Sequence, residues 1–368
     1  MVFENTHGLA AVRRLVLIAL FVTTRKSRTS MMLAALWLSA SGSLLAQTFS
    51  TLYLFGSGGP PTAGLVEGTD GSLYGTTDGY AGKQNGMIFK ITPSGTFATL
   101  HAGGAFATGL ILGTDGNFYG TSLAGGTLGR GWVFKSTPSG TLTTLHSFDT
   151  TDGAFPTALV QASDGNFYGT TKEGGTNSCL YGGTNYGCGT LFKMTPRGTL
   201  TTLYNFCSQS GCADGQEPGA MVQGTDGNLY GTTSAGGNAA CDGGCGTIFK
   251  ITTTGTLTTL HSFDLTDGDN PAAGLIQATN GNFYGITYSG GANNSNCTSG
   301  TCGTVFEMTP SGMLTRLHSF DYTDGANPIA PLIQATDGNF YGTTGGAGIA
   351  PLSPVVVGRC SKSPRQAR

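Results

Sequence analysis

The sequence predicts an all-β protein, a β-propeller of about six four-stranded antiparallel blades. A phrase such as SDGNFYGTTK, at residues 163–172, recurs six times with small changes. The tyrosines of the six copies are 45 to 62 residues apart, a period typical of propellers and solenoids. No segment repeats its apolar residues with the 3.6-residue period of a helix. The tyrosines are Tyr74, Tyr119, Tyr168, Tyr230, Tyr284 and Tyr341.

Each repeat is predicted to contain four short strands. The first strand is apolar, as at residues 273–278, and an Asp-Gly or Asn-Gly turn joins it to an aromatic second strand such as residues 283–287. Such turns need a positive φ, which Asn, Asp and Gly tolerate. A Pro-Ser-Gly type of turn leads from the third strand to the fourth, as at residues 256–263. The third strands are predicted at residues 86–92, 131–137, 189–195, 246–252 and 303–309.

The composition fits a folded array of strands and turns. Charged residues make up 10% of the 368 residues, against roughly 25% in an ordinary globular protein. The 62 glycines recur in register with the repeats, which indicates turns rather than low complexity. A net charge of −2 provides no basic surface, so we expect no nucleic-acid partner.

Residues 1–46 are predicted to be an export segment. The basic residues Arg25, Lys26 and Arg28 precede an apolar run at residues 31–46, an order typical of a secretory signal peptide. The alternative is an uncleaved N-terminal anchor. In either case we expect residues 47–344 to form a propeller repeat domain that is secreted or held at the cell surface.

The two ends of the repeat array favour a closed ring. Residues 48–55 have the pattern of a lone fourth strand, and the array ends at Thr344 with the first two strands of a sixth repeat. In a closed propeller, the N-terminal strand would complete the last blade. Residues 345–368 depart from the repeat, and codons read two bases out of frame from Val357 can spell GTVFKITPSGT, the missing third strand. We therefore expect a frameshifted tail; a solenoid with further repeats is the alternative.

Several phrases keep one order throughout the chain. DGNFYGTT, GTVFxMTPSG and TLTTLHSFDxTDGxNP resemble the phrases of the GloVer tandem repeat family, exported bacterial proteins with variable C-terminal anchoring. The resemblance covers about residues 48–344. It implies a secreted or surface-attached protein and carries no established activity.

Eight cysteines form four close pairs along the chain. In an exported protein, an even set of local pairs predicts disulfides. Each bridge would close one short loop and stabilise it by about 2 kcal/mol. The alternative is a zinc site, since Cys-x3-Cys can chelate zinc. The pairs are Cys179/Cys188, Cys207/Cys212, Cys241/Cys245 and Cys297/Cys302.

The histidines and most carboxylates follow the repeat, so we predict structural roles for them and no catalytic residue. One catalytic site in a ring needs unrepeated residues, whereas four histidines share one place in the fourth strand. The acidic phrases between repeats could bind calcium, the one cofactor considered, but their spacing differs from the EF-hand loop and Asx-turns explain them equally well. These residues are His101, His146, His261, His318, Asp149, Asp152, Asp264, Asp267, Asp269, Asp321 and Asp324.

Some polar residues do not follow the repeat, and we expect them at solvated loop positions. They are Lys83, Arg130, Lys172, Glu173, Glu217 and Asp242. The loops between second and third strands vary most in length, and binding usually occurs on variable loops of a rigid scaffold. Tyr181, Tyr186 and Tyr288 lie in or beside these loops, where they could stack on a sugar.

These observations predict a monomeric, secreted or cell-surface propeller that acts as a binding or structural module and not as an enzyme. The expected partners are an extracellular polysaccharide or a surface protein. Membrane contact would come only from an uncleaved signal segment or a lost C-terminal anchor. The alternative is an extracellular lyase or hydrolase with a propeller fold that acts on glycan, which would need unrepeated acids, bases or metal ligands that converge.

Overall fold

A computed structural model describes residues 51–55, 61, 63–78, 86–104, 108–271, 273–291, 297, 302–346 and the backbone of residues 355–357. The chain divides into two compact units, Met1–Leu54 and Phe55–Arg368, and all described strands belong to the second. The predicted export segment lies outside the described residues. Within the described part of the chain, no helix has the length and apolar character needed to span a membrane.

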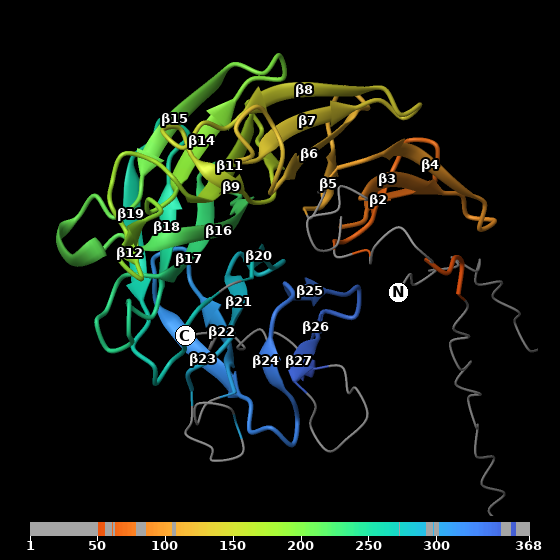
Figure 1. The fold of residues 1–368 in the computed structure, drawn as a ribbon. Coiled ribbons are helices and arrows are strands. Elements are labelled where there is room, and N and C mark those ends of the chain that lie inside the picture. Colours follow the sequence, from red (N-terminus) through yellow and green to blue (C-terminus); the bar gives the residue numbers. More distant parts are fainter. Residues whose placement is uncertain are drawn as a thin grey trace, which may run out of the picture. The chain divides into compact units, whose positions relative to one another are not determined.

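Four of the sheets share one plan, in which four antiparallel strands follow one another in sequence, so that each sheet occupies one band of the colour scale (Figure 1). Sheet 1 contains β1 (Val66–Glu67), β2 (Leu73–Thr76), β3 (Met87–Ile91) and β4 (Phe97–Ala102). Sheet 2 contains β5 (Leu110–Leu112), β6 (Phe118–Ser122), β7 (Trp132–Ser136) and β8 (Leu142–Ser147). Sheet 4 contains β16 (Gln216–Gln223), β17 (Leu229–Ala235), β18 (Thr247–Ile251) and β19 (Leu257–Ser262). Sheet 5 contains β20 (Ile276–Gln277), β21 (Phe283–Thr287), β22 (Thr304–Met308) and β23 (Leu314–Ser319).

Sheets 3 and 6 vary this plan. Sheet 3 contains β9 (Ala154–Pro156), β10 (Val160–Gln161), β11 (Phe167–Glu173), β14 (Thr190–Met194) and β15 (Leu200–Asn205). A hairpin of β12 (Leu180–Tyr181) and β13 (Thr184–Asn185) interrupts it, and a short 3-10 helix, η2 (Ser210–Cys212), precedes sheet 4. We call sheet 6 the strands β25 (Ile333–Gln334), β26 (Phe340–Gly342) and β28 (Val355–Val357), together with the pair β24 (Ala326–Pro328) and β27 (Thr344–Gly346).

The strands confirm the all-β prediction and the four-stranded antiparallel repeat. The predicted second strand at residues 283–287 is β21, and the predicted third strand at residues 303–309 contains β22. The first strands are less regular than predicted. In sheet 4 the register shifts between Pro218 and Met221, and in sheet 3 the same irregularity separates β9 from β10.

A glycine in each second strand lets the first and third strands pack across it. A Cβ at Gly169 would lie 2.5 Å from Cζ of Phe192 and 2.9 Å from Cδ2 of Leu159. Any larger residue would displace these two buried side chains, so packing explains why the repeat contains Tyr-Gly-Thr. The same crowding against a phenylalanine recurs at Gly75, Gly120, Gly231 and Gly285.

Aromatic rings join each sheet to the next. Tyr119 of β6 lies 4.1 Å, between ring centroids, from Phe167 of β11, and Phe148 after β8 lies 5.3 Å from Phe192 of β14. Both contacts recur between other successive sheets, and a separate cluster of buried residues lies at each junction between neighbouring sheets. The recurring pairs are Tyr74–Phe118, Tyr230–Phe283, Tyr284–Phe340, Phe206–Phe249 and Phe263–Phe306.

A glutamine in the first strand also contacts the preceding sheet. The backbone N–H of Thr114 in sheet 2 donates to Oε1 of Gln161 in sheet 3, at 2.9 Å. Gln223, Gln277 and Gln334 accept the same bond from Ser163, Thr225 and Thr279. The repeat therefore fixes both the fold of one sheet and its register on its neighbour.

The predicted N-terminal strand at residues 48–55 is not a strand in its described part, residues 51–55. Phe55 nevertheless packs on sheet 1, with its ring 5.0 Å from Phe89 and 5.8 Å from Phe97. Phe148, which follows β8 of sheet 2, packs on Phe192 of sheet 3 in the same way. Within the described residues no strand of sheet 1 pairs with sheet 6, so closure and the number of blades stay predictions.

Candidate binding site at the loop ends of sheets 3 and 4

The loop end of a sheet is the end at which its second strand ends and its third begins. In sheet 3, β11 ends with Lys172 and Glu173. The corresponding residues of sheet 4 are Ser234 and Ala235, which carry no charge. Sheets 2, 5 and 6 also have uncharged residues there, and sheet 1 has Asp78 at the position of Lys172 followed by a glycine. Two adjacent charged residues are therefore a departure from the repeat.

Arg130 of sheet 2 lies near Glu173 because a short strand connects them. Glu173 pairs in register with Ala154 of β9. The next residue, Phe155, donates its backbone N–H to the carbonyl of Arg130 at 2.9 Å. The loop end of sheet 2 is thereby held beside the end of β11.

Glu217 of sheet 4 approaches from the other side. Its backbone N–H donates to the carbonyl of Cys188 at 3.0 Å. A Cβ at the neighbouring Gly189 would lie 2.5 Å from Cδ of Pro218 and 3.0 Å from the Lys172 carbonyl oxygen, so these segments are in close contact. Oγ of Ser234 donates to Oε2 of Glu217 at 3.1 Å.

The other three charged residues act on the pKa of the Glu173 carboxyl. Burial and the negative charge of Glu217 raise the pKa of the Glu173 carboxyl, and the positive charges of Arg130 and Lys172 counter this only in part. Glu173 is half-buried, whereas Glu217, Arg130 and Lys172 are exposed. Three charged residues that do not follow the repeat, from three sheets, therefore act on the carboxyl of a fourth, Glu173. We call Arg130, Lys172, Glu173 and Glu217 the charged cluster.

The backbone at Glu217 is also unusual. The residue before the proline at the start of sheets 3 to 6 has a positive φ, 55° at Glu217 and 54° at Phe155. Sheets 5 and 6 have Asn270 and Asn327 there, and asparagine tolerates this conformation better than glutamate does. A carboxylate at this position has a conformational cost, and such costs are concentrated at functional sites.

The hairpin of β12 and β13 begins close to the charged cluster. The N–H of Gly174, the residue after Glu173, donates to the carbonyl of Tyr186 at 2.8 Å. Tyr181 on the hairpin is 82% exposed. Tyr288 occupies in sheet 5 the place that Lys172 has in sheet 3, and its backbone contacts are with Asn270 and Asn327. Of the three predicted tyrosines, Tyr181 and Tyr186 thus share one hairpin, and Tyr288 belongs to another sheet.

The structure joins the cysteines in the four predicted pairs as disulfides. They are Cys179–Cys188, Cys207–Cys212, Cys241–Cys245 and Cys297–Cys302. Disulfides persist in oxidising compartments, so these bridges fit a location outside the cytoplasm.

The repeated histidines and aspartates contact each other in three of the connections between sheets. Nε2 of His146 lies 2.6 Å from Oδ2 of Asp152, and His261 and His318 make the same contact with Asp267 and Asp324. In the fourth strand of sheet 3, Tyr204 replaces the histidine and donates its hydroxyl to Asp214 at 2.8 Å.

The acidic connections have the geometry of Asx-turns. Oδ1 of Asp149 accepts hydrogen bonds from the backbone N–H and hydroxyl of Thr151, which lower the pKa of the Asp149 carboxyl. The same bonds recur at Asp264 and Asp321. One oxygen of each of these three carboxylates therefore accepts hydrogen bonds from its own loop, and calcium binding at these connections stays a prediction.

Sequence reasoning found the members of the charged cluster but placed them separately, as solvated loop residues. Their convergence depends on contacts between sheets, which no single repeat encodes. The available signal was that each departs from the repeat close to a strand end. Lys83 lies outside the described residues, and Asp242 is an exposed loop residue without a described contact to the cluster.

Solved structures of similar fold cover most of this chain. A gluconolactonase from Xanthomonas campestris has 14% identity and a TM-score of 0.48, with 80% of this chain and 86% of that chain covered. A Thermus thermophilus structure described as a glucose dehydrogenase has 14% identity and a TM-score of 0.48, over 82% of this chain and 96% of that chain. A luciferin-regenerating enzyme has 10% identity and a TM-score of 0.45, over 74% and 80%. No curated protein matches the sequence.

These neighbours contradict the prediction that the protein is not an enzyme, since they are described as enzymes. That prediction is withdrawn. It depended on treating the unrepeated charges as isolated, whereas the structure groups four of them. At these identities the likeness concerns the fold and assigns no activity to this chain.

The sequence itself matches one repeat family twice. The pattern of the Gloeobacter/Verrucomicrobia repeat fits residues 40–181 and again residues 178–353. Together the two matches cover most of the chain and all of the described sheets up to β27. The chain therefore belongs to the Gloeobacter/Verrucomicrobia repeat family.

Proposed function

We propose that the protein is an exported six-bladed β-propeller that binds an extracellular glycan at the loop ends of sheets 3 and 4. The observation that carries the binding proposal is the convergence of Arg130, Lys172, Glu173 and Glu217 from three sheets. Residues that only solvate a loop have no reason to depart from the repeat at adjoining positions. A shared ligand gives that reason.

The packing of Phe55 supports closure of the ring. Its contact with Phe89 repeats the contact by which Phe148, Phe206 and Phe263 hold the following sheet. Phe55 therefore has the role of a residue that follows the outer strand of a preceding sheet. In a ring, that sheet is sheet 6, and residues 48–55 would be its outer strand.

The chemistry of the site supports a glycan. Carboxylates, a guanidinium and an ammonium group form charge-assisted hydrogen bonds with hydroxyls and with sugar carboxylates. Tyr181 presents an exposed ring on the hairpin that follows Glu173, and a tyrosine offers both an apolar face and a polar tip. The Cys179–Cys188 disulfide closes the base of this hairpin, and the Tyr186 carbonyl at its end accepts a hydrogen bond from Gly174, next to Glu173.

Glycan hydrolysis is a second candidate, favoured by one observation. Burial and the negative charge of Glu217 raise the pKa of the Glu173 carboxyl, and glycosidases pair a carboxyl of raised pKa with a second carboxylate. The same carboxylates would then bind the sugar and act on it.

The test measures binding and turnover together. The full secreted chain is screened against bacterial and plant polysaccharides, and the best ligand is titrated by calorimetry. Glu217→Asn, which installs the residue of sheets 5 and 6, should weaken binding about tenfold, the loss of roughly one charge-assisted hydrogen bond. Asp242→Asn is the control for loss of a surface charge and should leave affinity unchanged.

Unchanged affinity in both Glu217→Asn and Lys172→Ser would contradict the binding proposal. Release of reducing ends by the wild type, lost in Glu173→Ala, would establish the second candidate. Binding without such release would restrict the function to recognition.

A further inference from the structure

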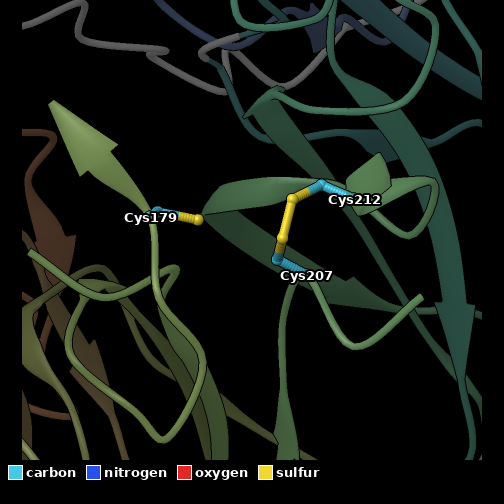
Figure 2. A group of neighbouring side chains, drawn as sticks. All are labelled: Cys179, Cys207 and Cys212. Atoms are coloured by element: carbon cyan, nitrogen blue, oxygen red, sulfur yellow. A yellow bond between two sulfur atoms is a disulfide. The ribbon is translucent and has the colours of Figure 1, made fainter. Parts of the chain in front are cut away.

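Two disulfides of neighbouring sheets bring their sulfur atoms together. The Sγ atoms of Cys179, Cys207 and Cys212 all lie within 4.8 Å of one another. Figure 2 shows the sulfur of Cys179 directed toward the bond between the other two. Cys179 is itself bonded to Cys188, so the cluster contains two bridges and not a bridge and a free thiol.

The three sulfur atoms come from segments that other contacts hold in place. Cys179 directly precedes β12, and Cys207 and Cys212 lie in the connection from β15 to β16. Oε1 of Gln216, at the start of β16, is 2.8 Å from Sγ of Cys179. The short distance between the bridges is thus part of the junction between sheets 3 and 4.

The two bridges differ in accessibility. Cys179, Cys207 and Cys212 are half-buried, whereas Cys188 is fully buried. A small thiol can therefore approach the bridge of Cys207 and Cys212 on either sulfur. It can reach the other bridge only at Cys179.

The backbone at Cys207 and Cys212 is left-handed. Their φ values are 58° and 53°, in the left-handed region that costs an L-residue about 1–2 kcal/mol. The two cysteines of this bridge are five positions apart in the sequence. The unbridged residues Thr150, Leu265 and Tyr322 have the same conformation at the place equivalent to Cys207. Accessibility, and not the backbone, therefore makes this bridge the more labile one.

We propose that these four cysteines form a thiol–disulfide exchange site. A low-molecular-weight thiolate attacks one sulfur of the Cys207–Cys212 bridge, forms a mixed disulfide with it and releases the other sulfur as a thiolate. That thiolate attacks Sγ of Cys179, forms a disulfide between sheets 3 and 4, and releases Cys188 as a thiolate. The buried Cys188 thiolate then takes a proton from solvent. One disulfide is consumed and one formed at each step, so no oxidant is needed.

The exchange would change what the hairpin of β12 and β13 is tied to. In the structure, Cys179 ties it to the base of β14 in its own sheet. After exchange, Cys179 would tie it to the connection that leads into sheet 4. This inference rests on the sulfur geometry and stands whether or not the hairpin contacts a glycan.

A peptide map of the full-length wild-type protein tests the proposal. The protein is treated with a limiting amount of reduced glutathione, blocked with an alkylating agent at low pH and digested with trypsin without reduction. Cleavage after Lys172, Lys193, Arg197 and Lys250 separates residues 173–193, with Cys179 and Cys188, from residues 198–250. The expected product joins these two peptides through Cys179 and leaves Cys188 alkylated.

Cys241–Cys245 is the matched control, because its nearest third group is the carboxylate of Asp269 and not a sulfur. It should give only reduced or glutathionylated cysteines. Glutathione on Cys207 or Cys212 with Cys179–Cys188 intact would overturn the proposal, as would cross-links that include Cys241 or Cys245 as often as Cys179. A Cys179→Ala, Cys188→Ala double variant should lose the cross-link; the wild-type map decides if that variant is not secreted.

Discussion

Sheets 3 and 5 share a backbone plan but differ in chemistry at their loop ends. In both, a Phe-Tyr-Gly second strand is crossed by a phenylalanine of the third, and a bridge of two cysteines closes the long loop. Sheet 3 ends its second strand with Lys172 and Glu173, whereas sheet 5 ends it with Tyr288 and Ser289. The acid before the next proline is Glu217 after sheet 3 and the amide Asn327 after sheet 5.

The two sheets also differ at the opposite end. In sheet 3, Asp164 accepts hydrogen bonds from the Tyr168 hydroxyl at 2.8 Å and from Lys193 at 3.1 Å. In sheet 5 the turn residue is Asn280, and Glu307 takes the place of the lysine and accepts from the Tyr284 hydroxyl at 2.7 Å. In sheet 5 the acid is on the third strand and an asparagine is at the turn, so the tyrosine hydroxyl still donates to a carboxylate. This difference conserves the structure, whereas the difference at the loop ends changes what the surface presents.

The shared scaffold predicts that the central glycines are equally essential in both sheets. Gly169→Ala and Gly285→Ala should each destabilise the protein by about 2–3 kcal/mol, because the new Cβ overlaps a buried phenylalanine and leucine. Urea unfolding measures both. Gly64→Ala is the control, since no atom lies within 4 Å of its Cβ position. A large loss in only one sheet would show that the two scaffolds are not equivalent.

The turn of sheet 3 predicts an acid-sensitive contribution of Asp164 to stability. Burial acts to raise the pKa of Asp164, but hydrogen bonds from Asn166, Tyr168 and Lys193 outweigh it and lower the pKa from 3.8 to about 2. A lowered folded-state pKa gives stability that is complete above the unfolded-state pKa and is lost as the pH falls through the folded-state pKa.

Asp164→Asn should therefore cost about 0.5–1 kcal/mol at pH 6, a value reduced for the partial exposure of the contact, and almost nothing at pH 2. Urea unfolding at the two pH values gives this difference. Asp242→Asn serves as the control for loss of one charge. A cost that does not change with pH would show that Asp164 acts by its shape and not by its charge.

The strand order and the cysteine pairs could be predicted from the sequence because both are local. The second strand of sheet 5 was predicted at the residues that β21 occupies, since its turn, aromatic residues and glycine adjoin in sequence. The charged cluster could not be placed, because Arg130, Glu173 and Glu217 belong to three repeats. Only the hydrogen bonds between sheets, such as that of Glu217 with Cys188, bring them together. The signal in the sequence was that Glu217 stands where other repeats have asparagine, at Asn270 and Asn327.

The smallest expected effect on stability is at Glu217. Replacing this residue should increase the free energy of unfolding but weaken ligand binding. Glu217→Asn should stabilise the protein by a few tenths to about 1 kcal/mol, because asparagine tolerates a φ of 55° better than glutamate does. The reverse change in sheet 6, Asn327→Glu, should destabilise by a similar amount. Urea unfolding of the two variants and the wild type measures both.

A stabilising Glu217→Asn that also weakens the ligand would mean that the carboxylate is kept at a cost in stability. Such a cost is expected of a residue that contacts a ligand and not of one that only closes a loop. If Glu217→Asn instead destabilised the protein, the hydrogen bond from Ser234 would explain the glutamate, and its role would be structural. The loop end of sheet 3 would then differ from that of sheet 5 in packing alone.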